Sequence, residues 1–244
     1  MIIRHSYLNK IGIFLVLSYL VSACAIQKPE IQSADLKHSY ELAVKDAEQA
    51  EPQEISKDLV AVVPSNHHLV WKKQDQKPLV LVVTWTDYDG YDDKIGQSIA
   101  LSREIWVTTV PEVKGFCKEL AGDKDLRLEQ RLGLPANSNK TKFVEMWVEP
   151  GNLFRPSPDP EITDSEAEIN FRMANPFLNT SDDYIKWFND LKMKSYGTNG
   201  YPWTRLGYTY DWGQDDHIGL SEFVIIKGAT VEVNAVSPTS EYCR

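Results

Sequence analysis

The pattern of apolar positions predicts several short strands in the larger, C-terminal part of the chain. Residues 59–63 and 79–85 are runs rich in Leu and Val, each beside a proline, and their length and composition suit buried strands better than helices. Two further strands are predicted over 99–110 and 142–148, where β-branched and other apolar residues gather again. The proline-rich stretch 150–160 is expected to be irregular, because proline cannot donate to a strand ladder.

Apolar residues at helical spacing predict about three helices in the same region. The first runs over 111–122, because proline is tolerated at a first helical position and glycine favours a helix end. The second is short, over 126–132, and stops before a glycine. The third, over 180–197, opens with cap-type residues and acids, which favour a helix N-terminus. Four large residues form its buried face: Tyr184, Trp187, Phe188 and Leu191.

The order of the predicted strands and helices along the chain suggests the fold class. Residues 223–226 and 230–236 flank a Lys-Gly-Ala turn and predict a hairpin with one solvent-facing side. Strands gather at both ends of the region and helices in its middle, without the regular alternation of a doubly wound sheet. We therefore expect a single α+β domain over 58–244, with a mostly antiparallel sheet and about three helices packed on it.

The first 24 residues have the features of an export signal. Two basic residues, a short apolar stretch and two small residues precede Cys24. The order Val-Ser-Ala-Cys at 21–24 resembles the lipobox of bacterial lipoproteins. This resemblance implies a signal peptide over 1–23 and a diacylglycerol joined to the thiol of Cys24. Acyl chains at that position would attach the protein to a membrane surface without spanning it.

Two other interpretations of this segment remain open. One is an ordinary signal peptide with a chance cysteine, and the other is an N-terminal anchor that is never cut. The uncut anchor is less favoured, because a membrane span needs about 20 apolar residues. In proteobacterial lipoproteins an aspartate after the lipidated cysteine favours the inner membrane, and here that position is Ala25. The resemblance therefore implies the periplasmic face of the outer membrane.

Composition separates residues 24–57 from the rest. This stretch is acidic and poor in large apolar residues, which is typical of a flexible tether. A helix over 34–50 is compatible with it, although its apolar stripe is too thin to require burial. The chain has a formal charge of −9, and the leader holds two basic and no acidic residues, so the remainder carries −11. A nucleic-acid partner is therefore not expected.

The cysteine count supports an exported protein in a second way. If Cys24 is lipidated, only Cys117 and Cys243 of the three cysteines remain. Two leftover thiols in an oxidising compartment usually pair, so we expect a disulfide between them. Two independent buried thiols are the alternative, and Cys117 does lie on the apolar side of a predicted helix.

The densest aromatic segment, 201–212, holds the candidate ligand-binding residues. Alternate residues of an extended chain share a face, and aromatic rings in a row can stack on sugars or anchor a partner protein. An aromatic stripe at strand spacing is also typical of ordinary core packing. The candidates for binding are Trp203, Arg205, Tyr208, Tyr210 and Trp212.

Acidic loops and histidines are the candidates for metal or catalytic chemistry. Residues 87–93 hold four aspartates around a glycine but depart from the EF-hand order, so a solvated turn explains them. The acids Asp159, Glu161 and Asp164 lie in a proline-shaped loop. The chain has no recognisable zinc spacing, nucleophile elbow or glycine-rich phosphate loop. We expect no metal and no cofactor, and we assign no catalytic residue.

Two functions follow from these patterns. The first is a lipid-anchored, non-catalytic binding domain of the periplasm that recognises a protein or an envelope glycan. An immunity-type protector that blocks a toxin enzyme is one concrete form of it. The second is an envelope hydrolase that uses the loop carboxylates or the histidines His67, His68 and His217. A deep pocket that joins these carboxylates to a histidine would favour the hydrolase, and an exposed patch with Trp203 or Trp212 would favour binding.

Overall fold

The computed structural model describes residues 28–171 and 181–244, and so the predicted lipobox and Cys24 lie outside the described residues. Five helices are described: α1 (Lys28–Asp46), α2 (Glu112–Lys118), α3 (Lys124–Arg131), α4 (Asp182–Ser195) and α5 (Thr239–Tyr242). Ten strands are described: β1 (Trp71–Gln74), β2 (Lys77–Thr86), β3 (Ser98–Ala100), β4 (Ile105–Thr109), β5 (Lys142–Val148), β6 (Leu153–Phe154), β7 (Tyr208–Tyr210), β8 (Ile218–Ser221), β9 (Phe223–Ile225) and β10 (Thr230–Pro238). No described helix is long and apolar enough to cross a membrane.

The strands form one large sheet and one small one. The large sheet has eight strands in the order β3-β10-β5-β2-β4-β9-β6, with β1 paired to β2, and the small sheet is the pair β7-β8. Every pairing between named strands in the described part is antiparallel. The predicted α+β class with an antiparallel sheet is confirmed, and α1 and α5 raise the helix number above the three expected.

Both faces of the central strands are buried. One face of the sheet forms a core that includes Val80, Val82, Val144, Met146, Phe223, Ile225, Val231 and Val233. The other face packs under α2, α3 and α5, and contributes Leu81, Val83, Trp85 and Phe143 to a second core. Because side chains alternate along a strand, a run that is apolar at every position can serve both cores. This explains why the sequence of β2 contains a continuous run of apolar residues.

Several predicted elements are confirmed and others are wrong. The strands at 79–85 and 142–148 and the helices at 126–132 and 180–197 are present as β2, β5, α3 and α4. The helix predicted over 111–122 is the shorter α2, and the predicted strand over 99–110 is split into β3 and β4. The stretch 150–160 is mostly irregular but includes a 3-10 turn at Pro150–Asn152 and the two-residue β6.

The strand predicted over 59–63 is wrong, although Leu59 and Val62 are buried as an apolar run requires. Its backbone bonds go to separate partners in place of a strand ladder. The N–H of Val60 donates to the Ser221 hydroxyl at 2.9 Å, and the carbonyl of Val60 accepts from the buried guanidinium of Arg155 at 3.3 Å. The N–H groups of Leu59 and Val62 donate to the backbone carbonyls of Ser165 and Ile162, at 3.1 and 2.6 Å. Backbone and side-chain partners from distant segments thus satisfy these groups without a regular strand ladder.

The predicted C-terminal hairpin is also wrong. β9 pairs with β4 and β6, whereas β10 pairs with β3 and β5, so the two strands lie at separate places in the sheet. The connection at 226–229 is held by hydrogen bonds to Leu101 and Asn152. Turn composition cannot tell a hairpin from such a crossing, because both need glycine at the turn.

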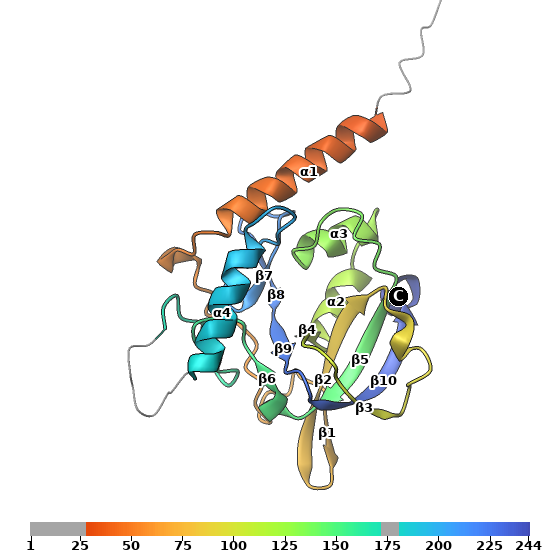
Figure 1. Cartoon of the computed structure of the whole chain (residues 1–244). Coiled ribbons are helices and arrows are strands. Elements are labelled where there is room, and N and C mark those ends of the chain that lie inside the picture. The colour runs from red at the N-terminus through yellow and green to blue at the C-terminus, as the bar shows by residue number, and fades with distance from the viewer. Residues whose placement is uncertain (1–27, 172–180) are drawn as a thin grey trace, which may run out of the picture.

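Helix α1 projects from the body at one end and packs on it at the other (Figure 1). Tyr40, Ala43 and Ala47 are buried against Tyr210 and Trp212. The apolar stripe of this helix is too thin for the sequence to require burial, yet the structure buries part of it. Small alanines leave room for one tyrosine to fill the contact, which a count of large apolar residues does not reveal.

The predicted disulfide is confirmed in the structure. Cys117 of α2 is bonded to Cys243, which follows α5, and their Cα atoms are 5.1 Å apart. Neither cysteine has more than 1% of its surface exposed. The bond ties the end of the chain to a helix on the same side of the sheet.

Candidate ligand-binding cavity

The five aromatic-segment candidates are all buried. Exposed fractions are 6% for Trp203, 9% for Arg205, 4% for Tyr208, 5% for Tyr210 and 9% for Trp212. The segment therefore presents no open stripe of rings on the surface. Any role of these residues in ligand binding stays a prediction, and it would have to act through a cavity.

The polar atoms of these candidates are used within the protein. The hydroxyl of Tyr208 donates to the Glu54 carbonyl at 2.8 Å, and that of Tyr210 donates to the Asp46 carboxylate at 2.8 Å. The indole N–H of Trp212 donates to the Leu134 carbonyl at 2.9 Å. Buried tyrosine and tryptophan normally find such partners. Most of the segment is accordingly packing that joins α1 to the body.

Arg205 likewise belongs to the packing. Its guanidinium donates to the carbonyls of Ala47 and Glu48, at 3.3 and 2.8 Å, directly after α1. The same group lies over the ring of Tyr196, 5.4 Å from its centroid. A cation at the C-terminal end of a helix is favourable, because the last carbonyls lack partners there. Arg205 thus holds α1 in place.

A cavity of about 410 Å³ lies between α4, β4, β7 and residues 132–134, which follow α3. Figure 1 shows α3 and α4 on either side of β7 and β8. Apolar and aromatic residues dominate the lining: Trp106, Leu132, Leu134, Leu191, Tyr201, Pro202, Trp203, Tyr208 and Tyr210. A smaller cavity of about 120 Å³ shares Trp106, Leu132, Leu134, Thr209 and Glu222 with it, so the two adjoin. This volume and lining are typical of small-molecule sites.

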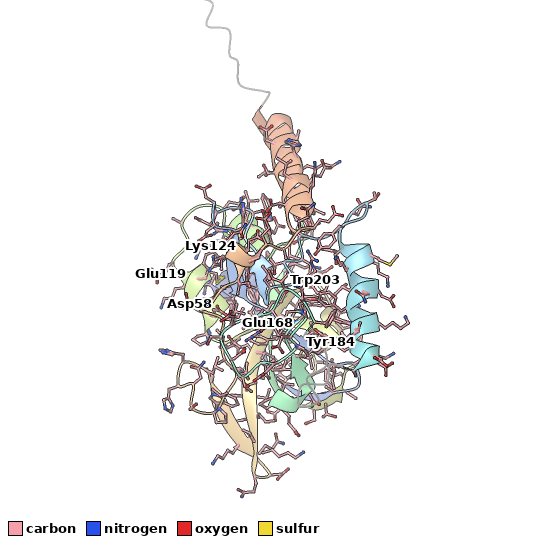
Figure 2. All side chains as sticks on the ribbon, turned by 90° about the vertical axis from the view of Figure 1, so that its left-hand side faces the viewer. Asp58, Glu119, Lys124, Glu168, Tyr184 and Trp203 are labelled. Atoms are coloured by element: carbon pink, nitrogen blue, oxygen red, sulfur yellow. A yellow bond between two sulfur atoms is a disulfide. The ribbon has the colours of Figure 1, made fainter. Side chains whose placement is uncertain are left out.

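Helix α4 builds one wall of the cavity. The Ser181 hydroxyl caps its start by accepting from the Tyr184 N–H at 3.2 Å. Phe188 packs on Trp203 with ring centroids 4.9 Å apart, and Leu191, one turn further along the helix, lines the cavity. Figure 2 shows Tyr184 and Trp203 on the side of α4 that faces the rest of the protein. Aromatic contacts thus hold the earlier part of α4, and the later part of the helix borders the cavity.

Glu222 is the only carboxylate that lines the cavity among the described residues. It is the single residue between β8 and β9. Its neighbours Phe223 and Ile225 face the inner core, so strand alternation turns Glu222 to the opposite side. Its backbone N–H donates to the Gly207 carbonyl at 2.9 Å, which fixes the position of the side chain.

Partial burial in the wall of the cavity raises the pKa of Glu222 from 4.5 to about 8, because the ionised form loses part of its hydration. The side chain keeps some accessible surface, but that surface faces the cavity. Within the described residues, its carboxyl group has no hydrogen-bond or ion-pair partner, and desolvation is the sole cause of its pKa shift. The described part of the protein therefore supplies no counter-charge to the ionised form.

Glu112 is a second buried carboxyl nearby, with a different environment. Burial raises its pKa to about 7, against the opposing effects of the Ser221 N–H and of Arg131. It accepts from the Ser221 N–H and from the Thr109 hydroxyl, each at 3.4 Å. Glu112 lines a separate surface groove and has partners, so it serves the packing of α2 on β4 and β8.

A wider groove runs between α1 and β7–β8. It measures about 620 Å³ and includes Asp46, Glu51 and Glu54 together with Tyr210, Trp212 and His217. The imidazole of His217 stacks on the Tyr210 ring with centroids 4.7 Å apart. The three carboxylates make this groove acidic.

The hydrolase candidates do not converge on a histidine in the described cavities. Asp159, Glu161 and Asp164 do come within 4.8 Å of one another, as could suit a metal, but Asp164 is paired with the buried Arg155 at 2.7 Å. His68 lines the groove that contains Glu112, and His217 lines the one beside α1. None of these described cavities includes the three loop acids.

The aspartate-rich turn at 87–93 is neutralised by lysines. Lys142 donates to Asp89 and Asp92, and Lys140 donates to Asp87 at 2.7 Å. Lys140 hydrogen bonding lowers the pKa of Asp87. Ammonium groups thus occupy the positions in which a calcium ion would need free carboxylate oxygens.

Sequence reasoning missed two residues that line the cavity: Trp106 of β4, and Glu222 at the junction of β8 and β9. The only local signal is an acid at the edge of the apolar run Phe-Val-Ile. Such an acid normally ends a strand in solvent. Only the packing of α4 and of residues 132–134 around it forms a cavity at this position.

No protein family, no curated protein and no solved structure matches this chain.

Proposed function

We propose that the protein is a lipid-anchored, non-catalytic binding protein of the bacterial envelope, and that it holds a ligand in the cavity beside α4. The observation that carries this proposal is an aromatic-lined cavity of about 410 Å³ with one unpartnered carboxyl group. Small-molecule sites are normally apolar concave cavities with a few polar groups that fix the ligand. This cavity has that combination of aromatic lining and one carboxyl group without a partner among the described residues.

The lipid anchor and the cellular location belong to the same proposal. Lipid at Cys24 would place the protein on a membrane, and Ala25 favours the periplasmic face of the outer membrane. The disulfide between Cys117 and Cys243 supports an oxidising compartment. The projecting end of α1 supports a spacer between the lipid and the body. The ligand would come from a protein or a glycan of the envelope, and an immunity-type protector is one form of this function.

The binding function is tested by filling the cavity. Leu191→Trp adds volume on the wall formed by α4, whereas Met193→Trp is a matched control because Met193 is 82% exposed on the same helix. The chain from residue 24, with Cys24→Ser, keeps every described residue and is incubated with envelope extract. Retained small molecules and glycans are identified by mass spectrometry. We expect retention by the unfilled protein and by Met193→Trp, and loss with Leu191→Trp.

Identical retention by the three proteins would contradict the binding function. Turnover of peptidoglycan or of ester substrates by the purified protein would favour the hydrolase in its place.

The anchor is tested by metabolic labelling with a clickable fatty acid. The wild type and Cys243→Ser are expected to take up the label, and Cys24→Ser to lose it. An unlabelled wild type, or equal labelling of Cys24→Ser, would remove the lipid anchor from the proposal.

A further inference from the structure

We infer that the ligand of this cavity carries an organic ammonium group, which pairs with the Glu222 carboxylate among aromatic rings. The inference rests on the proposed binding function and deepens it by naming the chemistry of the ligand. Three observations support it. The Glu222 carboxyl group has no partner in the described part of the protein, the nearby basic side chains pair with other carboxylates, and aromatic rings line the cavity.

The charge of the Glu222 carboxylate favours a cationic ligand in the cavity. A buried carboxylate without a partner is costly, and a cation of the ligand is the group that would compensate it best. An anionic ligand would meet like charge from Glu222. A neutral ligand would leave the carboxyl in its protonated form. The carboxyl therefore selects positive charge once it ionises.

The basic groups of the protein near the cavity are paired with other carboxylates. Lys140 also lines the cavity, but its ammonium group donates to Asp87 at 2.7 Å on the outside. Arg127 and Arg131 of α3 both pair with Asp211. Within the described part of the chain, these cations are held by other carboxylates. The counter-charge of Glu222 is left for a ligand to supply.

The aromatic residues of the lining can attract an organic cation. Trp106 and Trp203 both line the cavity, and their rings lie edge to face with centroids 6.2 Å apart. Tyr201 lines it as well and is 53% exposed, so it borders the route to solvent. Tryptophan gives the strongest attraction to organic cations, and ammonium groups are often enclosed by such rings. Apolar rings and one carboxylate form a suitable site for a compact ammonium head.

The test compares choline with 3,3-dimethylbutan-1-ol, its neutral isostere, by isothermal titration calorimetry. The protein is the chain from residue 24 with Cys24→Ser. We expect choline to bind at least about tenfold more tightly than the isostere, as one desolvated cation–aromatic and ion-pair contact implies. In Glu222→Gln this preference should disappear, with the fold verified by circular dichroism. Glu119→Gln is the control, because Glu119 is exposed and lies on the far side of the molecule from α4 in Figure 2.

A second readout is the pH dependence of choline binding. Choline keeps its charge at every pH, so its affinity should rise as pH increases through about 8, where Glu222 ionises. Lys140 and the tyrosines 201, 208 and 210 are the other titratable residues that line the cavity. Tyr196 interacts electrostatically with Glu222 from beyond the cavity. Glu222→Gln separates their contribution, because it should bind choline with a flat pH profile.

The outcomes separate the two proposals. No binding of choline, equal binding of the isostere, or an unchanged preference in Glu222→Gln would overturn the ammonium assignment. If the unfilled protein still retains an envelope ligand that Leu191→Trp loses, the binding function stands without it. If no ligand is retained in that assay, the binding function itself fails.

Discussion

Asp211 has no exposed surface, and its carboxylate accepts hydrogen bonds from both Arg127 and Arg131 of α3. The Gly213 N–H donates to the same carboxylate at 3.0 Å. Asp211 stands in the aromatic segment between Tyr210 and Trp212. These bonds fix the segment to α3 and help to keep the neighbouring rings of Tyr210 and Trp212 buried.

Asp211→Asn should lower the free energy of unfolding by about 3 kcal/mol, because two arginines lose their shared buried counter-charge. Urea denaturation measures the change. Asp190→Asn is the control, since Asp190 forms only an exposed pair with Lys186 within α4. It should leave the urea midpoint unchanged. Equal effects of the two substitutions would contradict a structural role for Asp211.

Glu112 and Glu222 predict how stability depends on pH. Their pKa values rise on folding, from 4.5 to about 7 and about 8, so the folded state binds protons more tightly than the unfolded state. Stability is therefore highest below pH 4.5 for these two groups and falls as pH rises to about 8.

Glu222→Gln should flatten this fall, because the substituted side chain never ionises. Each carboxyl contributes a slope of at most about 1.4 kcal/mol per pH unit within its window. Urea midpoints of the wild type and of Glu222→Gln are compared across that window. A wild-type profile that rises over the same window, or no difference between the proteins, would contradict the assigned burial.

At the scale of elements, α1 is attached to the body by its C-terminal half. The Tyr40 ring meets Trp212 edge to face at 5.8 Å, and its hydroxyl is 3.4 Å from the carbonyls of Gly133 and Gly200. Tyr40 thus contacts segments that precede and follow α4. Lipid anchored at the other end of this helix would pull directly on the body.

Tyr40→Ala should reduce the free energy of unfolding by about 3 kcal/mol, as expected for truncation of a buried aromatic side chain. Leu42→Ala is matched to it, because Leu42 lies on the same helix and is 53% exposed. Its effect should stay within about 0.5 kcal/mol. If α1 were an independent tether, neither substitution would move the urea midpoint of the chain.

At the scale of the whole molecule, the sheet and the disulfide bring distant segments together. β10 joins β3 to β5, and α5 at its end packs on the same core as α2 and α3. The Cys117–Cys243 bond closes a loop with a sequence separation of 126. It therefore constrains the unfolded chain over about half of its length.

Loss of this bond should lower stability by about 5 kcal/mol on the chain-entropy account. Urea denaturation of the wild type with and without a thiol reductant measures the effect. The double variant Cys117→Ser with Cys243→Ser should be insensitive to reductant, which separates the bond from the packing of the side chains. A wild type that is equally stable when reduced would show that the bond adds nothing.

The sequence by itself determined the features that depend on neighbouring residues. The pairing of Cys117 with Cys243 followed instead from the cysteine count. The local features are β2, β5, α3 and α4, and with them the α+β class. Side-chain periodicity and capping act over a few residues, so a local pattern is enough to predict them. The export signal is read in the same way, and its outcome stays a prediction.

Only the tertiary structure decided which strands pair, which rings are buried and where a cavity remains. β9 and β10 have the local pattern of a hairpin, yet strands from elsewhere separate them. Trp203 and Tyr210 have the composition of a binding surface, yet α1 and α4 cover them. Glu222 resembles a strand end in solvent, yet it lines a cavity formed by distant segments. Pairing and burial depend on contacts between residues far apart in the chain, and no local pattern contains those contacts.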